Sequence, residues 1–431
     1  MTDHERVDVA IVGAGAAGIG VGVALSALDL EIRILERDEI GASFRYWPAE
    51  MRCITPSFPS NSFGLTDLNA ITPDTSPALS LDREHPSGDE YADYLEVVAE
   101  FYELPVETGV EVTAVESRGG PAGAESDEET ASECERADAV TAVDGERADA
   151  VTAVDGGAID DPETNGGFVL ETHDGPIHSE YVVWAGGQFG TPRTDHVPGS
   201  SLCVHTSEVE SWADYAAARS ADDFLIVGGF ESGIDAAVAL VEAGRRVRVL
   251  DSGEPWAARG PDPSDVLSPY TLERLESVAD SDRLQVEGGA VVEEVRRRSD
   301  GCFEVDARPA DGYELDDGDG TYTVGTRPLL ATGFEPTLGP VANLFPRAEG
   351  TIRLTDRDES PSTPGLFLAG PAVEHDDVEF CFIYKFRARF PVIAETIGER
   401  LGVDTEPLQV YREANMFLDD LSCCEPDLCD C

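Results

Sequence analysis

A glycine-rich stretch near the start of the chain has residue types and spacing suited to holding a diphosphate. An apolar run at 7–12 is followed by the pattern G-x-G-x-x-G, formed by Gly13, Gly15 and Gly18. In this pattern the first glycine allows a tight turn, the second lets a pyrophosphate approach the backbone, and the third lets a helix lie close to a sheet. Because the first amides of a helix attract anions, we expect Ala16 and Ala17 to lie beside the phosphates.

A second stretch, at 223–251, repeats this arrangement. An apolar run leads into Gly228 and, five positions later, Gly233, with Ser232 just before it. Phe230 stands where the first stretch has its middle glycine, and its side chain would crowd a pyrophosphate unless it turns away. We interpret this stretch as a second dinucleotide site. At both places the alternative is a glycine-rich turn without a ligand.

One acidic residue follows each stretch at the same distance. Glu36 and Asp251 each lie 23 positions after the first glycine of their stretch, and each follows an apolar run typical of a strand. A carboxylate at that point accepts hydrogen bonds from ribose hydroxyls. Because Asp251 repels a 2′-phosphate, it favours NADH over NADPH. Three arginines nearby in the sequence keep NADPH open, namely Arg245, Arg246 and Arg259.

The composition limits the class of protein. The 431 residues include 86 acidic and 30 basic side chains, which give a net charge of −56. A surface of this sign repels nucleic acid and anionic membranes. The excess of carboxylates with a single lysine is similar to proteins of salt-accumulating haloarchaea, and an acidic mesophilic protein is the alternative. Without an apolar run long enough for a membrane span, and with no visible export signal, we expect a cytoplasmic protein.

Two dinucleotide patterns in one chain suggest that electrons pass from one dinucleotide to another. The chain resembles flavoproteins with two dinucleotide-binding domains, a group of flavin-containing monooxygenases, thioredoxin-reductase-like enzymes and bacillithiol-disulfide reductases. Three further segments carry the resemblance, at 184–187, 331–336 and 365–370. The resemblance implies FAD at the first glycine-rich stretch and NADH or NADPH at the second.

The resemblance also implies a domain plan. We expect an α/β fold with two Rossmann-like domains, in which an NAD(P)H domain at 221–330 is inserted in an FAD domain split between 1–200 and 331–400. A tail follows at 401–431. Residues 117–165 have the composition of an acidic surface insertion, in which ERADAVTAVDG occurs twice in tandem. The further cofactor contacts that we expect are Arg37, Trp47, Gly186, Thr332, Gly333 and Gly370.

The signatures that would choose a reaction are incomplete. No C-x-x-C or C-x-x-x-x-C occurs before the tail, and Ala17 stands where bacillithiol-disulfide reductases have a cysteine. The F-x-G-x-x-x-H signature of flavin monooxygenases keeps its histidine, His205, but has Gly199 and Ser201 in place of its other two residues. Since oxygen chemistry needs no protein thiol, a flavin-monooxygenase-like oxidoreductase is our main interpretation.

Lys385 and two tail cysteines are the candidate catalytic groups. Lys385 lies in an aromatic segment that, by the resemblance, packs near the flavin, and its amine can donate to the ring or to a substrate. Cys423 and Cys424 form a vicinal pair, similar to that of mercuric reductases, and a tail this rich in thiols can bind a soft metal or relay electrons. The alternatives are therefore a disulfide or metal-thiol reductase and a non-catalytic redox sensor. The expected partner is a small molecule, thiol or disulfide, and a homodimer stays open.

Overall fold

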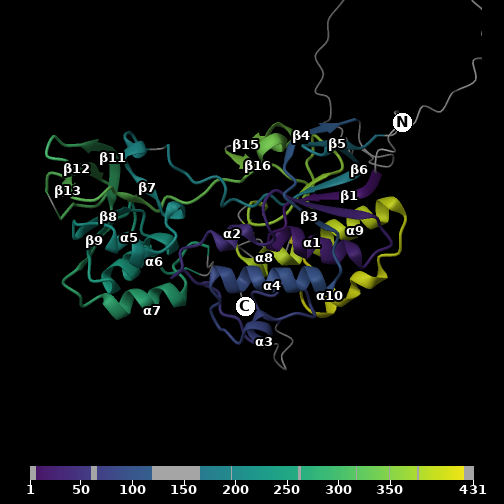
Figure 1. Ribbon diagram of the computed structural model, residues 1–431, viewed down its shortest axis with the longest axis horizontal. Coiled ribbons are helices and arrows are strands. Elements are labelled where there is room, and N and C mark those ends of the chain that lie inside the picture. The colour runs from purple at the N-terminus through teal and green to yellow at the C-terminus, as the bar shows by residue number, and fades with distance from the viewer. Residues whose placement is uncertain are drawn as a thin grey trace, which may run out of the picture.

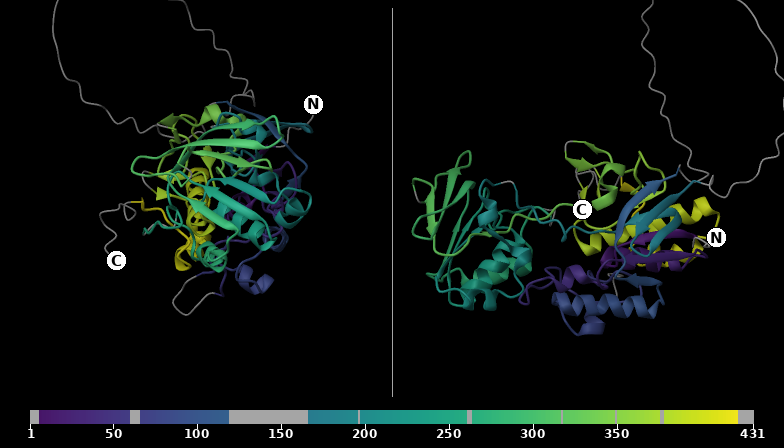
Figure 2. Two further views of the ribbon diagram at one scale, coloured as in Figure 1. Left: turned by 90° about the vertical axis from the view of Figure 1, so that its left-hand side faces the viewer. Right: turned by 45° about the horizontal axis from the view of Figure 1, so that its top comes forward.

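Two lobes lying side by side make up the described part of the protein (Figures 1 and 2). The computed structural model describes residues 6–59, 66–118, 166–195, 197–260, 264–316, 318–348, 350–375 and 378–421. The first lobe holds the beginning and the end of the chain, and the second lobe holds its middle, from about 204 to 330. All but the first two residues of the acidic insertion, and all four cysteines of the tail, lie outside the described residues.

A seven-stranded mixed sheet forms the centre of the first lobe. Its strands are β1 (Arg6–Val12), β2 (Ile32–Glu36), β3 (Val106–Thr108), β4 (Val112–Ser117), β5 (Phe168–Thr172), β6 (Gly175–Trp184) and β17 (Leu366–Leu368). Their spatial order is β3-β2-β1-β6-β5-β4, and β17 pairs with the second half of β6. The apolar run that predicts β1 is buried between parallel neighbours on both sides. Residues 105–115 have the pattern of one strand, but they form two, because the chain turns at Gly109 with φ +75°.

Helices α1 (Ala16–Ser26) and α9 (Phe390–Leu401) pack closely against each other in this lobe. Their approach depends on Gly20, since an added Cβ would lie 2.1 Å from the Phe390 ring. Helix α4 (Gly88–Phe101) starts with a capping box, in which Ser87 and Glu90 satisfy each other's backbone amides. The remaining helices and hairpin strands of the lobe are α2 (Ala42–Arg45), α3 (Pro77–Leu81), α8 (Ile383–Phe386), α10 (Gln409–Glu413), β15 (Arg347–Ala348), β16 (Thr351–Ile352), β18 (Glu374–His375) and β19 (Val378–Glu379).

A five-stranded parallel sheet forms the centre of the second lobe. Its strands, in spatial order, are β10 (Leu284–Glu287), β9 (Arg246–Leu250), β8 (Asp223–Val227), β14 (Leu329–Leu330) and β7 (Val204–His205). One face is covered by α5 (Trp212–Ala217), α6 (Glu231–Glu242) and α7 (Pro269–Val278). The other face is covered by an antiparallel sheet of β11 (Ala290–Arg297), β12 (Phe303–Pro309) and β13 (Thr321–Val324), as Figure 1 shows.

Among the helices that the structure describes, none combines the length and the apolar character that a membrane span requires. The same residues contain no group of three or more histidine, cysteine, aspartate or glutamate side chains placed to hold a metal ion. The tail that suggested metal binding is outside this range, so the metal hypothesis stays a prediction.

A buried ion pair ties the end of the chain to the first lobe. The Arg389 guanidinium donates to Asp358, with Nε 2.9 Å from Oδ2 and Nη2 3.0 Å from Oδ1. Both side chains are buried, and Arg389 also donates to the carbonyl of Leu418 beyond α10. His375 forms a hydrogen bond with the same carboxylate, with its Nε2 2.5 Å from Asp358 Oδ1. Because a buried charge without its partner is costly, this pair should control the stability of the lobe.

We predict that Arg389→Met destabilises the protein by about 3–5 kcal/mol, because the buried Asp358 carboxylate loses its guanidinium partner and keeps only the contact with His375 among those described above. Urea unfolding in molar KCl, followed by circular dichroism, measures the loss. The exposed residue Arg353 provides a matched control, since Arg353→Met should change the free energy of unfolding by less than about 0.5 kcal/mol. A similar effect of the two substitutions would contradict the role given to the buried pair.

Candidate functional site

The first cradle, defined as the loop at 13–18 together with Glu36, is held by a close backbone packing. Gly13 has φ +105°, and an added Cβ would lie 2.4 Å from the carbonyl oxygen of Ala185. At Gly18 an added Cβ would lie 1.8 Å from the carbonyl oxygen of Gly13. The Glu36 carboxylate accepts a hydrogen bond from the Ala14 amide at 2.7 Å. The loop therefore has the shape that the glycine spacing predicts.

At Gly15 the same loop leaves room for a ligand. An added Cβ there would find only the Ser43 hydroxyl within 4 Å, at 3.9 Å. Gly15 is the N-cap of α1 and has no side chain to cap the first amides of the helix. Ala16 and Ala17 are buried in that first turn. The cradle thus combines open space with helix-terminal amides, and it fits the diphosphate of a dinucleotide such as FAD.

The second cradle, the loop at 228–233 with Asp251, repeats this geometry. Gly228 has φ +101°, and an added Cβ would lie 2.3 Å from the carbonyl oxygen of Ala331. At Gly233 an added Cβ would lie 1.9 Å from the carbonyl oxygen of Gly228. The Asp251 carboxylate accepts from the Gly229 amide at 2.6 Å. The equal spacing in the sequence thus corresponds to two backbone loops with nearly the same internal contacts.

Four other residues were predicted to contact the cofactor at the first cradle, and the structure places them in different surroundings. Gly370 is beside the loop, since an added Cβ would come within 3.1 Å of the Ala17 Cβ. Gly186 is packed against the carbonyl of Thr337. Trp47 packs into the lobe, with its ring centroid 5.1 Å from that of Phe44, and Arg37 is exposed, with its guanidinium near Asp38. Gly370 is therefore a neighbour of the loop, whereas these contacts do not direct Trp47 or Arg37 toward it.

Thr332 and Gly333 belong to the connections between the lobes. The Thr332 hydroxyl donates to the carbonyl of Arg193 at 2.5 Å, and the Arg193 amide donates to the carbonyl of Gly333 at 3.0 Å. Pro192 and Phe334 form an antiparallel bridge beside them. Hydrogen bonds thus pair the two connections along their length, and this pairing limits how far the lobes can move apart. In the second cradle itself, Ser232 is half-buried in the first turn of α6.

Lys385 reaches from the first lobe to the second. Its Nζ donates to the Ser264 hydroxyl at 2.7 Å, and the Cys381 Sγ lies 3.2 Å from the same oxygen. Lys385 and Cys381 belong to the segment around α8, and Ser264 to the loop before α7. The structure therefore places the only lysine of the chain at the boundary between the lobes. Cys423 and Cys424, its companions in the prediction, lie outside the described residues.

A second boundary contact was not foreseen from the sequence. The Glu50 carboxylate of the first lobe accepts from the Ser211 hydroxyl at 3.0 Å and from the amides of Trp212 and Ala213 at 2.9 and 3.0 Å. It thereby caps α5 from the other lobe. Burial raises the pKa of Glu50, but the hydrogen bonds from Ala213 and Trp212 outweigh it, so the pKa lies below its ordinary value.

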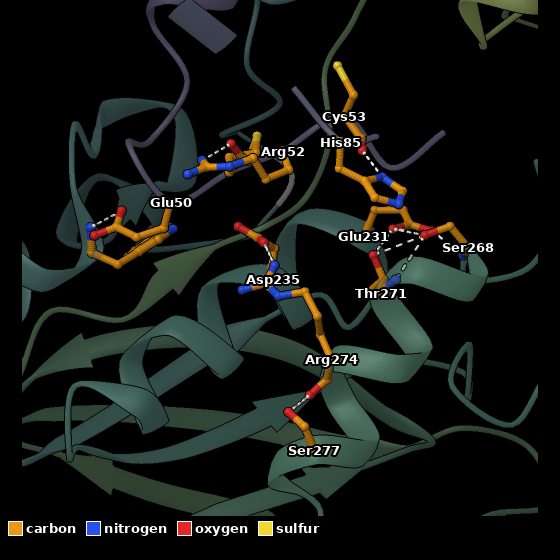
Figure 3. Close-up of polar contacts among 12 residues, drawn as sticks. Glu50, Arg52, Cys53, His85, Glu231, Asp235, Ser268, Thr271, Arg274 and Ser277 are labelled. Carbon is orange, nitrogen blue, oxygen red and sulfur yellow. Dashed lines mark hydrogen bonds and ion pairs between the residues drawn. The ribbon is translucent and has the colours of Figure 1, made fainter. Parts of the chain in front are cut away.

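Figure 3 shows the side chains that face each other across this boundary. His85 of the first lobe stacks on Tyr270 of α7, with ring centroids 4.1 Å apart. Beside them, Glu231 of the second cradle accepts from the amide and hydroxyl of Ser268, and from the Thr271 hydroxyl, so that α6 is tied to the start of α7. Burial raises the pKa of Glu231 despite these hydrogen bonds. One signal was available in the sequence, because Glu231 is the first residue of a helix whose second half is almost entirely apolar.

The sequence comparison agrees with two cradles on two sheets. The profile of a family described as "Pyridine nucleotide-disulphide oxidoreductase" matches residues 10–133 and 157–370. The chain belongs to this family. As a pyridine nucleotide-disulphide oxidoreductase it is an FAD-dependent NAD(P)H oxidoreductase with the expected α/β fold of two Rossmann-like sheets. The match leaves out residues 134–156, which contain both copies of the tandem repeat, so the repeat is an addition to the family pattern.

Proteins with names from more than one reaction class are similar to this pyridine nucleotide-disulphide oxidoreductase in sequence or in fold. Bacilliredoxin reductase Bdr of Bacillus subtilis is 30% identical over 243 residues, which are 55% of this chain and 67% of the relative. The structure of bacillithiol disulfide reductase Bdr from Bacillus cereus has a TM-score of 0.61 at 20% identity, covering 92% of this chain and 100% of the other. A flavin-containing monooxygenase from Stenotrophomonas maltophilia has a TM-score of 0.57 at 14% identity, covering 92% and 99%. At these identities the two structures show the fold alone.

We predict that Glu50→Gln loosens the contact between the lobes, because an amide accepts the hydrogen bonds of α5 less strongly than a carboxylate. Hydrogen exchange in molar KCl should show the amides of Trp212 and Ala213 exchanging about tenfold faster.

The same contact should depend on pH. Because the pKa of Glu50 is lowered from 4.5 in the folded protein, the stability that Glu50 gives to the contact is present above pH 4.5 and is lost as the pH falls through the lowered pKa. Glu39→Gln, at an exposed site, is the control. Unchanged exchange in Glu50→Gln would refute the contact.

Proposed function

We propose that this protein oxidises NADH and passes the electrons through FAD to a disulfide. The observation that carries the proposal is the 30% identity to bacilliredoxin reductase Bdr over two thirds of that relative. In the reaction, one NADH and one proton reduce one disulfide to two thiols, and NADH becomes NAD⁺. Bound FAD supplies a carrier that accepts two electrons from a nicotinamide and gives them to a sulfur acceptor.

We assign FAD to the first cradle and NADH to the second. In each cradle the helix-terminal amides attract a diphosphate, and the carboxylate at the end of the second strand is placed for a ribose. Glu36 and Asp251 already hold a loop amide each, which keeps both carboxylates oriented toward their loops. This assignment follows the order of the two sites in the flavoproteins that the chain resembles.

The surroundings of Asp251 favour NADH over NADPH. Its second oxygen accepts from the Gly253 amide at 2.8 Å, so both oxygens are fixed at the cradle. Arg245 is bound to Asp222 at 2.8 Å, and Arg259 donates to the carbonyl of Ala258 at 2.6 Å. A 2′-phosphate at this ribose would therefore lie against a fixed carboxylate, while Arg245 and Arg259 are held by other oxygens.

We predict that Asp251→Ala lowers kcat/KM for NADH by about tenfold, because hydrogen bonds to the ribose are lost. It should raise kcat/KM for NADPH, because the repulsion of the 2′-phosphate is removed. Steady-state reduction of ferricyanide, which accepts electrons without a thiol, measures both constants. Asp282→Ala, two residues before β10, is the matched control. An unchanged NADH to NADPH ratio in Asp251→Ala would contradict the assignment.

Oxygen is the second candidate acceptor, as in the monooxygenase interpretation. It is favoured by Ala17 in the first cradle, since a bacillithiol-disulfide reductase would be expected to have a thiol at this position. Burial also raises the pKa of Cys53 to about 12 and that of Cys203 to about 11, which suppresses the reactive thiolates. If the acceptor is a disulfide, we assign the thiol chemistry to Cys423 and Cys424. Lys385 is then the candidate for positioning the acceptor at the lobe boundary.

We predict that, without air and in molar KCl, oxidised glutathione or cystine sustains NADH oxidation with two thiols formed per NADH. The double variant Cys423→Ser with Cys424→Ser should lose this activity by at least about a hundredfold, while its reduction of ferricyanide stays unchanged. Lys385→Met should raise KM for the disulfide more than it lowers kcat, and Cys302→Ser serves as the cysteine control. NADH oxidation that requires oxygen and ignores every disulfide would reject the proposal in favour of the monooxygenase.

A further inference from the structure

A pocket of about 260 Å³ lies on the second lobe, at the end of the parallel sheet that is opposite the second cradle. The starts of β8 and β9, the approach to β10 and the strand β13 line it. The loop of the second cradle follows the last residue of β8, so the length of this strand, about 15 Å, separates the two places. In Figure 1, β9 and β13 lie on the side of the second lobe that faces away from the first lobe. The pocket is therefore separate from the nucleotide cradle and from the lobe boundary.

Three arginines line this pocket, namely Arg246, Arg248 and Arg283. Arg246 and Arg248 are two positions apart on β9, so they share one face of the sheet, while Val247 between them packs toward the helices on the other face. Arg283 lies beside the start of β9, because its carbonyl accepts from the Val247 amide at 2.7 Å. Like charges on neighbouring strands repel each other. In a chain with 86 acidic residues, this concentration of positive charge indicates a negatively charged ligand.

Two of the three guanidinium groups are held in place by the protein. Arg248 donates to the buried Glu287 carboxylate, with Nη1 3.2 Å from Oε2, and its guanidinium lies 5.0 Å from the centre of the Tyr322 ring. Arg283 donates from Nη1 to the carbonyl of Gly244 at 2.6 Å. Guanidinium groups that are already oriented lose little freedom when they bind a ligand.

The charges of Arg246 and Arg283 are not neutralised by the protein. Neither forms an ion pair with a carboxylate in the part of the chain that the structure describes, and Arg246 is exposed. Asp223 and Asp282 also line the pocket, but both lie beyond ion-pair distance of these arginines, and Asp223 Oδ2 accepts from the Gly325 amide at 2.9 Å. An anion that enters the pocket can therefore bind two guanidinium groups without displacing a carboxylate.

We propose that this pocket binds the phosphate group of a small molecule, held by Arg246, Arg248 and Arg283. Guanidinium groups match the geometry of phosphate oxygens, and a phosphate dianion can accept hydrogen bonds from several of them at once. The volume lies below the usual range for pockets that hold drug-sized ligands, so the ligand is a free phosphate or a small phosphate ester.

The surrounding charge limits the ligand further. Asp223 and Asp282 would repel a polyanion that extends past the pocket, so the site suits one phosphate group and not a nucleic acid. The acidic surface of the whole protein repels anions at long range. Molar salt reduces the screening length to about 3 Å, so this repulsion does not keep a phosphate away from arginines that it can contact directly.

Calorimetric titration with inorganic phosphate in molar KCl tests the inference. The FAD-containing protein is first saturated with NAD⁺, so that the phosphate cannot bind to either cradle. The wild type should bind phosphate saturably, and Arg246→Gln with Arg283→Gln should raise the Kd at least about tenfold, because charge-assisted hydrogen bonds are lost. Arg297→Gln with Arg308→Gln removes the same charge from exposed positions of the same lobe. This matched control should stay within about twofold of the wild type.

Two further measurements make the test decisive. If the double variant does not fold, as judged by circular dichroism, Arg246→Gln alone replaces it and should raise the Kd about threefold, because this side chain loses no ion pair within the described residues. Glycerol 3-phosphate is the second probe: tighter binding than that of inorganic phosphate assigns the site to a phosphate ester, and weaker binding assigns it to free phosphate.

The inference would be overturned if the wild type showed no saturable binding up to about 50 mM phosphate, or if the pocket variants bound phosphate as tightly as the wild type. Reduction of ferricyanide by NADH should be unchanged in the pocket variants, because the pocket lies at the far end of β8 from the cradle. Failure of disulfides as acceptors would reject the proposed function and leave the phosphate titration unaffected.

Discussion

A backbone carbonyl that occupies the place of a missing side chain is the contact on which both halves of the protein depend. The carbonyl oxygen of Ala185 lies where a Cβ of residue 13 would be, and the carbonyl oxygen of Ala331 lies where a Cβ of residue 228 would be. Each carbonyl belongs to the strand end that returns beside the first strand of its sheet, β6 in one lobe and β14 in the other. The contact therefore fixes the turn of each cradle against its own sheet. A side chain at either glycine would force the strand ends apart and open the loop.

The chemistry of the protein then depends on how the two cradles are held relative to each other. The two connections at 187–193 and 333–337, which are paired by backbone hydrogen bonds, join the lobes at one place. Three further contacts join the lobes elsewhere. Glu50 caps the start of α5, His85 stacks on Tyr270, and Lys385 donates a hydrogen bond to Ser264. Electron transfer between two dinucleotides requires their reactive rings to meet, so contacts that set the angle between the lobes belong to the functional site even where they touch no cofactor.

The acidic composition acts over longer distances than these contacts do. Where an arginine is available, it collects several carboxylates, as Arg45 does with Glu39, Asp93 and Glu96. The 86 acidic residues of the chain outnumber the 30 basic ones, so a large negative charge stays uncompensated. Their mutual repulsion is long-range and is reduced by salt, whereas the buried pair of Arg389 with Asp358 is screened far less. The buried contacts can thus hold the fold at salt concentrations that weaken surface pairs.

The sequence by itself determined the elements that depend on neighbouring residues. The apolar run before Gly13 predicts β1, the glycine spacing predicts the turn and the start of α1, and the repeat of that spacing predicts the second cradle with Asp251. These predictions succeed because strand burial, a positive φ and close helix packing each depend on residues a few positions apart. The family itself followed from the same residues, and the comparison confirmed it.

Only the tertiary structure decided what meets at the lobe boundary. Glu50 lies more than 160 positions from the helix that it caps, and Lys385 lies 121 positions from Ser264. No local pattern encodes such contacts, because they depend on how two sheets are oriented by the connections between them. The single strand expected at 105–115 was wrong for a related reason, since β3 and β4 are chosen by different partners, β2 and β5. Sequence spacing sets the local shape of each cradle, and packing between distant segments sets what the two cradles can do together.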